Sequence, residues 1–301
     1  MSFNGFKNII QKGDTVILYL TTNQMYRVKA EPKKLSKKGI VTKNIVQTPC
    51  GALKCASLIG KEYGTKIYLS KGCGYVLQPS PELWTLTLPH RTQIIYTPDI
   101  SMIVLQLEII PGSVVIESGT GSGSLSHAVI RAIKPHGHLY TFDFHQIRMQ
   151  TAKSEFQDHG LSEWVTVIHK DVCGHGFGDD LENKADAVFL DLPLPWLAIP
   201  YAKKCIKSTG GRLGFQELQT MEIVRTKYSI QTQTMEVLDF DSLKTEKAEE
   251  VQEGTEEQVV NTVAFMPPNT QPGHSGYLTF ATLPPSWATN FAFEKCSITD
   301  E

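Results

Sequence analysis

The residues best suited to chemistry follow a short apolar run, residues 114–116, which the sequence predicts as a buried strand. Glu117 ends this run, and glycines follow at alternate positions, Gly119, Gly121 and Gly123, before apolar residues recur at helical spacing. A strand, a glycine turn and a helix open a nucleotide-binding βαβ unit. The spacing E-x-G-x-G-x-G, unlike G-x-G-x-x-G, suits a nucleoside that lacks phosphate and has a charged amino-acid end, such as S-adenosylmethionine. The alternative is a tight turn that binds no ligand.

Two further acids follow predicted strands. Asp143 ends the strand expected at residues 138–143, where a carboxylate can accept both ribose hydroxyls or cap the next helix. Arg148 lies one turn into that helix, and it either supports the same region or belongs to the helix surface. Asp171 and Val172 follow the strand at residues 164–168. These two residues either contact the edge of the cofactor's adenine ring or form an ordinary turn without a ligand contact.

A third acid, Asp191, ends the predicted strand 187–191 and is followed by two prolines and Trp196. Ligands bind at the carboxyl edge of such sheets. A carboxylate that accepts from an exocyclic amine, beside a rigid aromatic ring, can hold a planar base. The alternative is a structural loop with Trp196 in the core.

The remaining candidate site residues are two residues before the first predicted helix of this region and three histidines. Gln93 and Tyr96 precede an apolar helix expected up to residue 107, and are candidates to cover the methionine end of the cofactor. His127, His145 and His169 lack ligand spacing and are interpreted as structural. The six cysteines form no C-x-x-C pair, so we expect reduced thiols and no metal site.

The elements that must position these residues form an α/β fold. Strands are expected at residues 114–117, 138–143, 164–168, 187–191 and from 211 onward, alternating with helices. This alternation predicts a doubly wound parallel sheet. A last strand is expected at residues 276–281.

The N-terminal part has a different pattern. Residues 1–78 contain short strands separated by glycine turns, which predict a small β-barrel, with a lysine-rich loop or arm at residues 33–43. Residues 1–80 hold thirteen Lys and Arg against three Asp and Glu. This bias indicates a polyanion partner, or otherwise a solvated lysine surface.

The expected domains are therefore residues 1–78, the β-barrel, and residues 79–285, the sheet with its helices. Residues 239–261 are predicted as a disordered acidic insertion and residues 286–301 as a loose tail. No apolar run reaches the length of a membrane span, and no secretory signal is expected.

Taken together, several stretches resemble the catalytic subunits of tRNA (adenine-58-N1)-methyltransferases. They are PELWTLTLPHRTQIIYTPDI, VIESGTGSGSLSHAV, DFHQIR, DVCGHGF, DAVFLDLPLPW and HSGYLTFAT. The resemblance implies a β-barrel before a Rossmann-like methyltransferase domain, S-adenosylmethionine as cofactor, tRNA as substrate, and a nuclear heterotetramer with a homologous non-catalytic subunit. It also implies tRNA contacts near Leu20, residues 51–58 and Tyr75. It makes Asp191 the catalytic residue, and the cofactor residues would be Gln93, Glu117, Ser118, Gly119, Thr120, Gly121, Ser122, Gly123, Ser124, Asp143, Arg148, Asp171, Val172 and Asp191.

The sequence departs from the family in three places. Residues 33–47 look like an insertion, and Cys55 replaces the usual histidine of a tRNA-facing stretch. After Leu213 about twenty residues of the family pattern, which include a helix between two parallel strands, are missing. Neighbouring parallel strands need a crossover connection of about a dozen residues or more. The alternative function is therefore a non-catalytic or inactive chain of the same tRNA-binding assembly. A methyltransferase of small molecules or proteins is a third reading, which the basic N-terminal region disfavours.

Overall fold

The computed structural model describes residues 3, 5–35, 39–88, 93–212, 219–222, 229–236, 259–266 and 277–283. The chain divides into two compact units, Met1–Met221 with Leu278–Glu301, and Glu222–Tyr277. The expected division near residue 78 stays a prediction. So does the tail 286–301, which lies outside the described residues.

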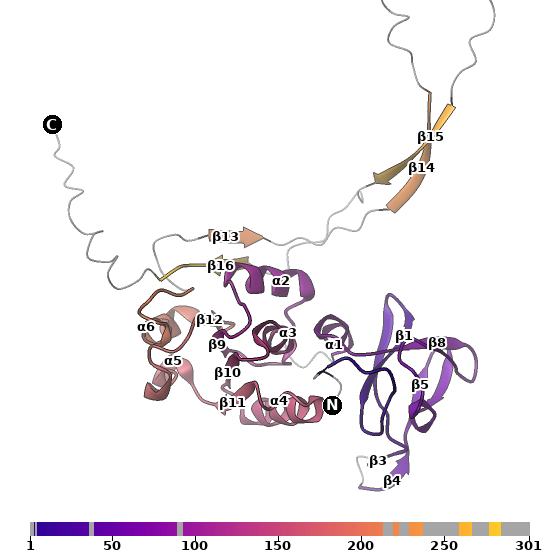
Figure 1. Ribbon diagram of the computed structural model, residues 1–301, viewed down its shortest axis with the longest axis horizontal. Helices are drawn as coiled ribbons and strands as arrows, with labels where there is room; N and C mark the ends of the chain where they lie inside the picture. Colours follow the sequence, from indigo (N-terminus) through magenta and orange to yellow (C-terminus); the bar gives the residue numbers. More distant parts are fainter. Residues whose placement is uncertain are drawn as a thin grey trace, which may run out of the picture. The chain divides into compact units, whose positions relative to one another are not determined.

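The first unit is built around a parallel sheet, as the sequence predicts. Its strands are β9 (Val114–Ser118), β10 (His138–Asp143), β11 (Val165–His169) and β12 (Ala187–Leu190), in the order β11-β10-β9-β12 (Figure 1). Because β9 is central, the loops after β9, β10 and β12 meet at one carboxyl edge. Most of the site residues come from these loops, and the others follow β11 or precede α2.

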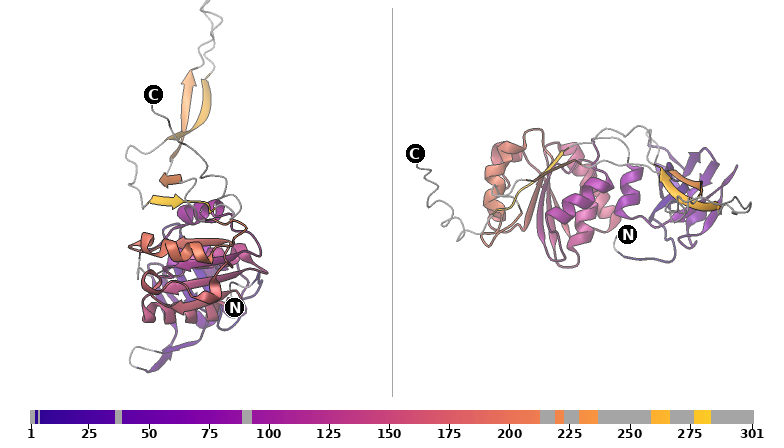
Figure 2. Two further views of the ribbon diagram at one scale, coloured as in Figure 1. Left: turned by 90° about the vertical axis from the view of Figure 1, so that its left-hand side faces the viewer. Right: turned by 90° about the horizontal axis from the view of Figure 1, so that it is seen from above.

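Helices cover both sides of this sheet, as the right-hand view of Figure 2 shows. One core contains residues of α2 (Thr97–Gln106), α3 (Ser124–Ile133) and α4 (Gln146–His159). The other contains residues of α5 (Val172–His175) and α6 (Pro195–Cys205). The doubly wound α/β fold is confirmed.

The far edge of the sheet is only partly formed by described residues. Arg212 makes a parallel bridge to Ala187 beside β12, and Gly211 bridges Leu283 antiparallel. β16 (Tyr277–Phe280) is the expected last strand, and it pairs with β13 (Gln219–Glu222). The fifth strand expected from residue 211 thus has only isolated bridges, and residues 213–218, where the apparent deletion falls, lie outside the description.

The second unit contains an antiparallel pair, β14 (Ser229–Glu236) and β15 (Val259–Met266), with Ser229 opposite Met266. The prediction of disorder for residues 239–261 is wrong for 259–261, which begin β15. The sequence VVNTVAF alternates little in polarity but is rich in β-branched residues, which favour strands. Residues 239–258 lie outside the described part.

The N-terminal residues form strands, as expected. β1 (Thr15–Thr21), β2 (Gln24–Lys29), β7 (Lys66–Tyr68) and β8 (Cys73–Leu77) make an antiparallel sheet in the order β2-β1-β8-β7. Two hairpins accompany it, β3 (Lys33–Leu35) with β4 (Val41–Lys43) and β5 (Ile45–Thr48) with β6 (Gly51–Lys54), before the 3-10 helix η1 (Cys55–Leu58). The described pairings leave these as separate sheets, so a closed barrel is not confirmed. In the lysine-rich stretch expected as a loop or arm, the described residues form the paired strands β3 and β4.

The N-terminal sheet packs through β2 against the part of the chain that contains the parallel sheet. Arg27 lies 5.0 Å above the ring of Trp84 on α1 (Pro81–Thr87) and 3.4 Å from the Glu155 carboxylate on α4. Lys29 lies 2.9 Å from Asp158. These contacts tie the N-terminal sheet to the same helix whose first turn borders the pocket described below.

Candidate cofactor and acceptor site

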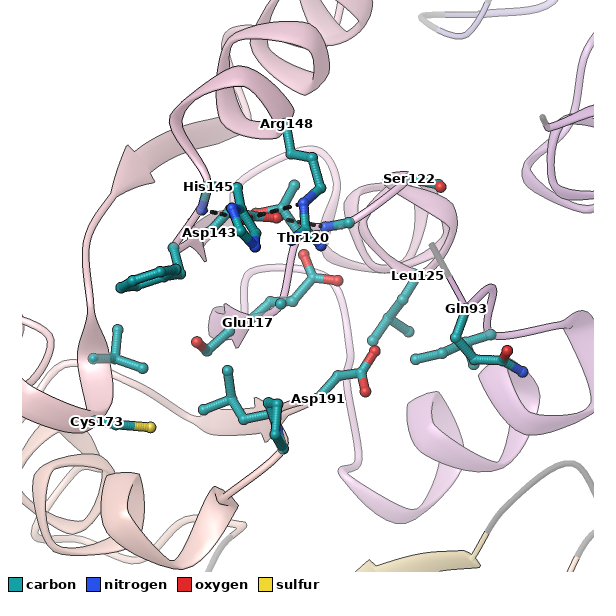
Figure 3. Close-up of a pocket in the computed structure, with 18 of the residues that line it drawn as sticks. Gln93, Glu117, Thr120, Ser122, Leu125, Asp143, His145, Arg148, Cys173 and Asp191 are labelled. Atoms are coloured by element: carbon teal, nitrogen blue, oxygen red, sulfur yellow. Dashed lines mark hydrogen bonds and ion pairs between the residues drawn. The ribbon is translucent and has the colours of Figure 1, made fainter. Parts of the chain in front are cut away.

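A pocket of about 720 Å³ lies at the carboxyl edge of the sheet (Figure 3). Figure 3 shows Asp143, His145 and Arg148 on one side, and Asp191 and Gln93 toward the other. Apart from Gly123, all the residues predicted to bind the cofactor line it: Gln93, Glu117, Ser118, Gly119, Thr120, Gly121, Ser122, Ser124, Asp143, Arg148, Asp171, Val172 and Asp191. The topology therefore brings the four predicted acids to one cavity.

Glu117 is a buried carboxyl at the end of β9, only 2% exposed. Its Oε2 atom accepts hydrogen bonds from the hydroxyls of Ser126 (2.6 Å) and Thr141 (2.7 Å). Burial raises the pKa of Glu117, nearby Asp191 and Asp143 add to the rise, and the two hydroxyls oppose it, so that the pKa lies at about 7. A cation in the pocket would favour the ionised form.

The glycine turn needs its glycines for two reasons. Gly119, Gly121 and Gly123 have φ values of 102°, 52° and 73°, a region that side chains rarely adopt. A Cβ atom on Gly119 would also collide with the backbone carbonyl of Asp191. The turn and the loop after β12 are therefore in direct contact.

Gly123 is the one predicted cofactor residue that does not line the pocket. It is the N-cap of α3, and its carbonyl accepts from His127 Nδ1 at 2.6 Å. The Nε2 atom of His127 lies 2.8 Å from His159 Nδ1. Because the carbonyl only accepts, His127 Nδ1 donates and Nε2 accepts from His159. Burial lowers the pKa of His127 to about 4, which confirms this histidine as a structural one.

The hydroxyls of Thr120 and Ser124 are bonded within the protein. Thr141 donates to Glu117, so Thr120 must donate to Thr141 at 2.6 Å. Ser124 donates to the Ile95 carbonyl at 2.8 Å, and its hydroxyl oxygen lies 2.7 Å from that of Thr85. These two residues therefore present mainly backbone to the pocket.

Asp143 is held in place by the chain before any ligand arrives. Its Oδ2 atom accepts from the Gly121 amide at 3.0 Å and Oδ1 from the His145 amide at 2.8 Å. Arg148 Nε is 3.9 Å from Oδ1. Burial raises the pKa of Asp143, while the Gly121 amide, Arg148 and His169 oppose that shift. The remaining lone pairs can accept from a ligand.

Asp171 has the role that its alternative interpretation gave it. It is the N-cap of α5, and its Oδ1 accepts from the amides of Cys173 (3.1 Å) and Gly174 (3.3 Å). Val172 is buried beside it and lines the pocket. The carboxylate of Asp171 thus stabilises the turn that presents Val172.

Asp191 lines the pocket as the first residue after β12, and its amide donates to the Ser118 carbonyl at 2.8 Å. Its side chain faces the open pocket and is exposed by surface area, yet enough protein surrounds it that desolvation raises the pKa of its carboxyl. Within the described part of the chain, this carboxylate has no hydrogen-bond partner. Trp196 is 60% exposed, so its placement in the core is wrong.

Sequence reasoning missed part of the lining. His145, which we interpret as structural from the sequence, lines the pocket, whereas Tyr96 is the N-cap residue of α2 and is not among the lining residues. The other lining residues that sequence reasoning missed lie beside or shortly after predicted site residues: Ile94, Ile95, Leu125, Phe144, Lys170, Cys173, Leu192, Pro193 and Leu194. That adjacency was the available signal. Among the described residues, no cluster of acids, histidines and cysteines could hold a metal ion.

The fold and the site define a class, the Rossmann-like S-adenosylmethionine-dependent methyltransferases. A SAM-dependent O-methyltransferase from Thermotoga maritima superposes with a TM-score of 0.68 at 24% identity, over 92% of this chain and 95% of its own. The tRNA (m1A58) methyltransferase TrmI from Aquifex aeolicus superposes with a TM-score of 0.60 at 22% identity, over 91% of this chain and 98% of its own. At these identities the likeness establishes the fold.

Sequence comparison narrows the class to one family. Residues 72–214 match the family described as tRNA methyltransferase complex GCD14 subunit. The tRNA (adenine(58)-N(1))-methyltransferase catalytic subunit of Dictyostelium discoideum is 35% identical, over 92% of this chain and 98% of its own length. The corresponding catalytic subunit of Schizosaccharomyces pombe is 44% identical over an alignment that covers 67% of this chain and 54% of the Schizosaccharomyces protein. The chain belongs to the family of tRNA (adenine-58-N1)-methyltransferase catalytic subunits.

These relatives are named catalytic subunits, so the alternative of a non-catalytic chain is not favoured. The alignment with the Dictyostelium protein is 317 positions long, more than the 301 residues of this chain, so that relative has segments which this chain lacks. In the described part of the chain, no helix is long and apolar enough to cross a bilayer.

Proposed function

We propose that the chain transfers the methyl group of S-adenosylmethionine to N1 of adenine 58 in the T loop of tRNA, as the catalytic subunit of a two-subunit enzyme. The contact between Gly119 and the Asp191 backbone carries this proposal. It places an acid suited to the acceptor base directly beside the turn suited to the cofactor. The names of the relatives supply the reaction and the base.

The pocket fits this cofactor in size and charge. Small-molecule sites have volumes of roughly 300–1,000 Å³. Glu117, Asp143 and Asp191 together favour a ligand with a sulfonium and an ammonium group. When bound, S-adenosylmethionine supplies an already activated methyl group. We assign its binding to Gln93, Glu117, Ser118, Gly119, Thr120, Gly121, Ser122, Ser124, Asp143, Arg148, Asp171, Val172 and Asp191, with Gly123 shaping the turn from behind.

Asp191 is our candidate for the catalytic residue. Adenine N1 has a lone pair at neutral pH, so no strong base has to deprotonate it before it attacks the methyl carbon and displaces S-adenosylhomocysteine. Positive charge then develops on the base. An ionised Asp191 accepts a hydrogen bond from the N6 amine and offsets that charge. Among the described residues no hydrogen-bond partner occupies this carboxylate, so it can accept from the base.

The acceptor base must leave the stacked tRNA to reach Asp191. Leu194 and Trp196 are 45% and 60% exposed and follow Asp191 closely in the chain. Pro193 and Pro195 limit the backbone freedom of this loop. We assign to this loop the apolar surface on which the base rests, so that the chain's main contribution is alignment and exclusion of water.

The proposed function includes a substrate, tRNA, and a partner subunit. The family is described as a subunit of a tRNA methyltransferase complex, which supports tRNA as the substrate. We further propose a homologous non-catalytic subunit as the partner, a heterotetrameric assembly and a nuclear location. Copurification followed by mass measurement of the complex tests the assembly.

The decisive experiment incubates this chain and the partner subunit with methyl-labelled cofactor and unmodified tRNA. We expect label in wild-type tRNA and none in a matched tRNA whose adenine 58 is replaced by uridine. Equal labelling of both would contradict the assigned base. No labelling, with a thermal shift by S-adenosylhomocysteine intact, would contradict tRNA as the acceptor and leave the cofactor site standing.

A further inference from the structure

Residues 93–95 form part of one side of the pocket, and we call them the wall segment. Gln93, Ile94 and Ile95 all line the cavity, and Figure 3 places Gln93 on the side of Asp191. The wall segment belongs to no helix or strand, so contacts with its surroundings must hold it in position. Two of these contacts lead to α1, a helix whose own residues do not line the pocket.

The first contact is apolar. Ile94 is 6% exposed and packs in a small cluster with Trp84 and Leu88. The Trp84 ring is 2% exposed, and it lies 5.4 Å from the ring of His127 and 4.5 Å from the ring of His159, measured between centroids. Ile94 is therefore packed against a side chain that α3 and α4 already hold in place.

The second contact is a buried network of hydroxyls. Thr85 Oγ1 lies 2.7 Å from Ser124 Oγ, and Ser124 donates to the Ile95 carbonyl at 2.8 Å. Thr85 Oγ1 also lies 2.8 Å from the Pro81 carbonyl, so three short contacts share two hydroxyl hydrogens. Thr85 is 2% and Ser124 5% exposed, and buried polar groups depend on partners within the protein. Thr85 thus fixes Ser124, and Ser124 fixes the Ile95 carbonyl.

Helix α1 is itself fastened to α3, beside which it lies (Figure 1). Arg131 on α3 donates to both carboxylate oxygens of Glu82, at 2.6 and 3.0 Å. An exposed ion pair adds little stability, but two parallel hydrogen bonds fix the orientation of its partners. At the start of α1 the Ser80 side chain accepts from the Leu83 amide. Thr85 therefore has a defined position before any ligand binds.

The two sides of the pocket suit different ends of the cofactor. Asp143, which suits the ribose, lies on one side with His145, whereas Gln93 and Asp191 lie toward the other (Figure 3). A ligand whose ribose is at Asp143 extends its amino-acid end toward the side that contains the wall segment. Loss of the contacts of that segment should therefore affect this end of the ligand and spare the adenosine end.

We propose that Thr85 is a positioning residue of the cofactor pocket, which acts through Ser124 to hold the wall segment against the amino-acid end of the cofactor. The identity of the ligand rests on the proposed function. The role of Thr85 is measured by binding alone, without tRNA, the partner subunit or methyl transfer.

The test compares two ligands by calorimetric titration of the full chain: S-adenosylhomocysteine, and adenosine, which lacks the amino-acid end. Thr85→Val keeps the shape of the side chain but places a methyl group against Ser124 Oγ. S-adenosylhomocysteine affinity should fall about 2- to 10-fold, the range that loss of one buried hydrogen bond gives. Adenosine affinity should stay within about twofold of wild type. Thr85→Ser keeps the hydroxyl and should bind both ligands as the wild type.

Thr87→Val is the matched control on the same helix. The Thr87 hydroxyl donates to the Trp84 carbonyl at 2.9 Å, and Thr87 does not line the pocket. This variant should bind both ligands normally. Thermal unfolding without ligand shows whether each variant is folded. Thr85→Ala, which also removes the hydroxyl and favours the helix, is a second variant with the same expected loss.

A double-mutant cycle tests whether Thr85 acts through Ser124. Ser124→Ala removes the hydrogen bond to Ile95 directly, and it should also weaken S-adenosylhomocysteine binding. If the two residues form one connection, Thr85→Val combined with Ser124→Ala loses no more affinity than the larger of the two single losses. Losses that multiply would mean that Thr85 acts by another route, and would overturn the proposal.

Two further outcomes overturn it. Wild-type affinity of Thr85→Val and Thr85→Ala for S-adenosylhomocysteine would show that the wall segment does not need Thr85. An equal loss for both ligands would make Thr85 a residue of the general fold. A chain whose S-adenosylhomocysteine binding responds to Thr85 as expected, but which methylates no tRNA, would instead contradict the proposed function and leave the role of Thr85 standing.

Discussion

The two walls of the pocket are built differently. The cofactor wall consists of the ends of β9 and β10 with the glycine turn, and its acids are bonded to their own chain: Glu117 to Ser126 and Thr141, Asp143 to the Gly121 amide. The acceptor wall consists of residues 191–197. In the described part of the chain its Asp191 carboxylate has no hydrogen-bond partner, and Leu194, Trp196 and Leu197 are 45–60% exposed.

This difference shows which wall has its polar groups hydrogen-bonded within the protein before a substrate binds. On the cofactor wall, buried polar groups must be satisfied by the protein, because an unpaired one costs about 1–3 kcal/mol. On the acceptor wall, the exposed polar and apolar groups contact solvent. The cofactor wall is thus preorganised, and under the proposed function the base exchanges these solvent contacts for contacts with the acceptor wall.

The largest expected effect is on the acceptor wall. Asp191→Asn keeps the size of the side chain but removes its charge, and we expect methyl transfer to fall about 10²- to 10³-fold, as when an electrostatic stabiliser is lost. Asp191→Ala should abolish measurable transfer. In both variants tRNA affinity should remain near wild type in a filter-binding assay, and Asp179→Asn, an exposed acid elsewhere, should behave as wild type. Wild-type turnover with the partner subunit present would remove Asp191 from the mechanism.

On the cofactor wall, Asp143→Ala should weaken S-adenosylhomocysteine binding about 10- to 100-fold, because charge-assisted hydrogen bonds contribute roughly 1.5–3 kcal/mol. Binding of tRNA should be unaffected. Isothermal titration calorimetry measures the first and filter binding the second. A variant that binds cofactor normally but tRNA weakly would reverse the assignment of the two walls.

The buried Glu117 predicts a pH dependence. Its pKa of about 7 means that the carboxyl is mostly neutral at pH 6 and mostly ionised at pH 8. A cationic cofactor prefers the ionised form, so its affinity should rise roughly tenfold between these pH values. Calorimetric titrations of wild type and Glu117→Gln should differ in this respect, with a flat profile in the variant. A flat profile in the wild type would mean that Glu117 does not sense the ligand charge.

The same carboxyl affects stability with the opposite sign. Its folded-state pKa lies above the unfolded value of 4.5, so its stabilising contribution is complete below pH 4.5 and is lost as the pH rises through about 7. Without ligand, Glu117→Gln should therefore gain melting temperature relative to wild type as the pH is raised from 5 to 8. Thermal unfolding at both pH values checks this.

The smallest effect is expected from the exposed ring of the acceptor wall. Trp196→Ala should raise the KM for tRNA about fivefold, the low end of what one base–aromatic stack contributes, with kcat little changed. Trp196→Phe should recover most of the loss. A change in cofactor affinity of the same size would instead place Trp196 on the cofactor wall.

The site could be predicted from sequence to the extent that it follows chain-local rules. Glu117, the glycine turn, Asp143 and Asp191 each end a buried strand, and parallel strands bring such ends to one edge. Lys170 was missed, and His145 was interpreted as structural, because their only signal was closeness to a predicted strand end or site acid, which many other polar residues share. Gly123 was assigned to the ligand, but its left-handed backbone serves the first turn of α3.

The sequence by itself determined the strands of the parallel sheet, their parallel orientation, the acids at their ends and the basic N-terminal region, because these depend on periodicity and composition. Only the tertiary structure decided which groups are already bonded. It turned Asp171 into a helix cap, left Asp191 facing open space, exposed Trp196 and aligned Tyr19, Tyr75 and Lys66 across three strands. Hydrogen-bond partners and strand register join residues far apart in the chain, and no local pattern specifies them.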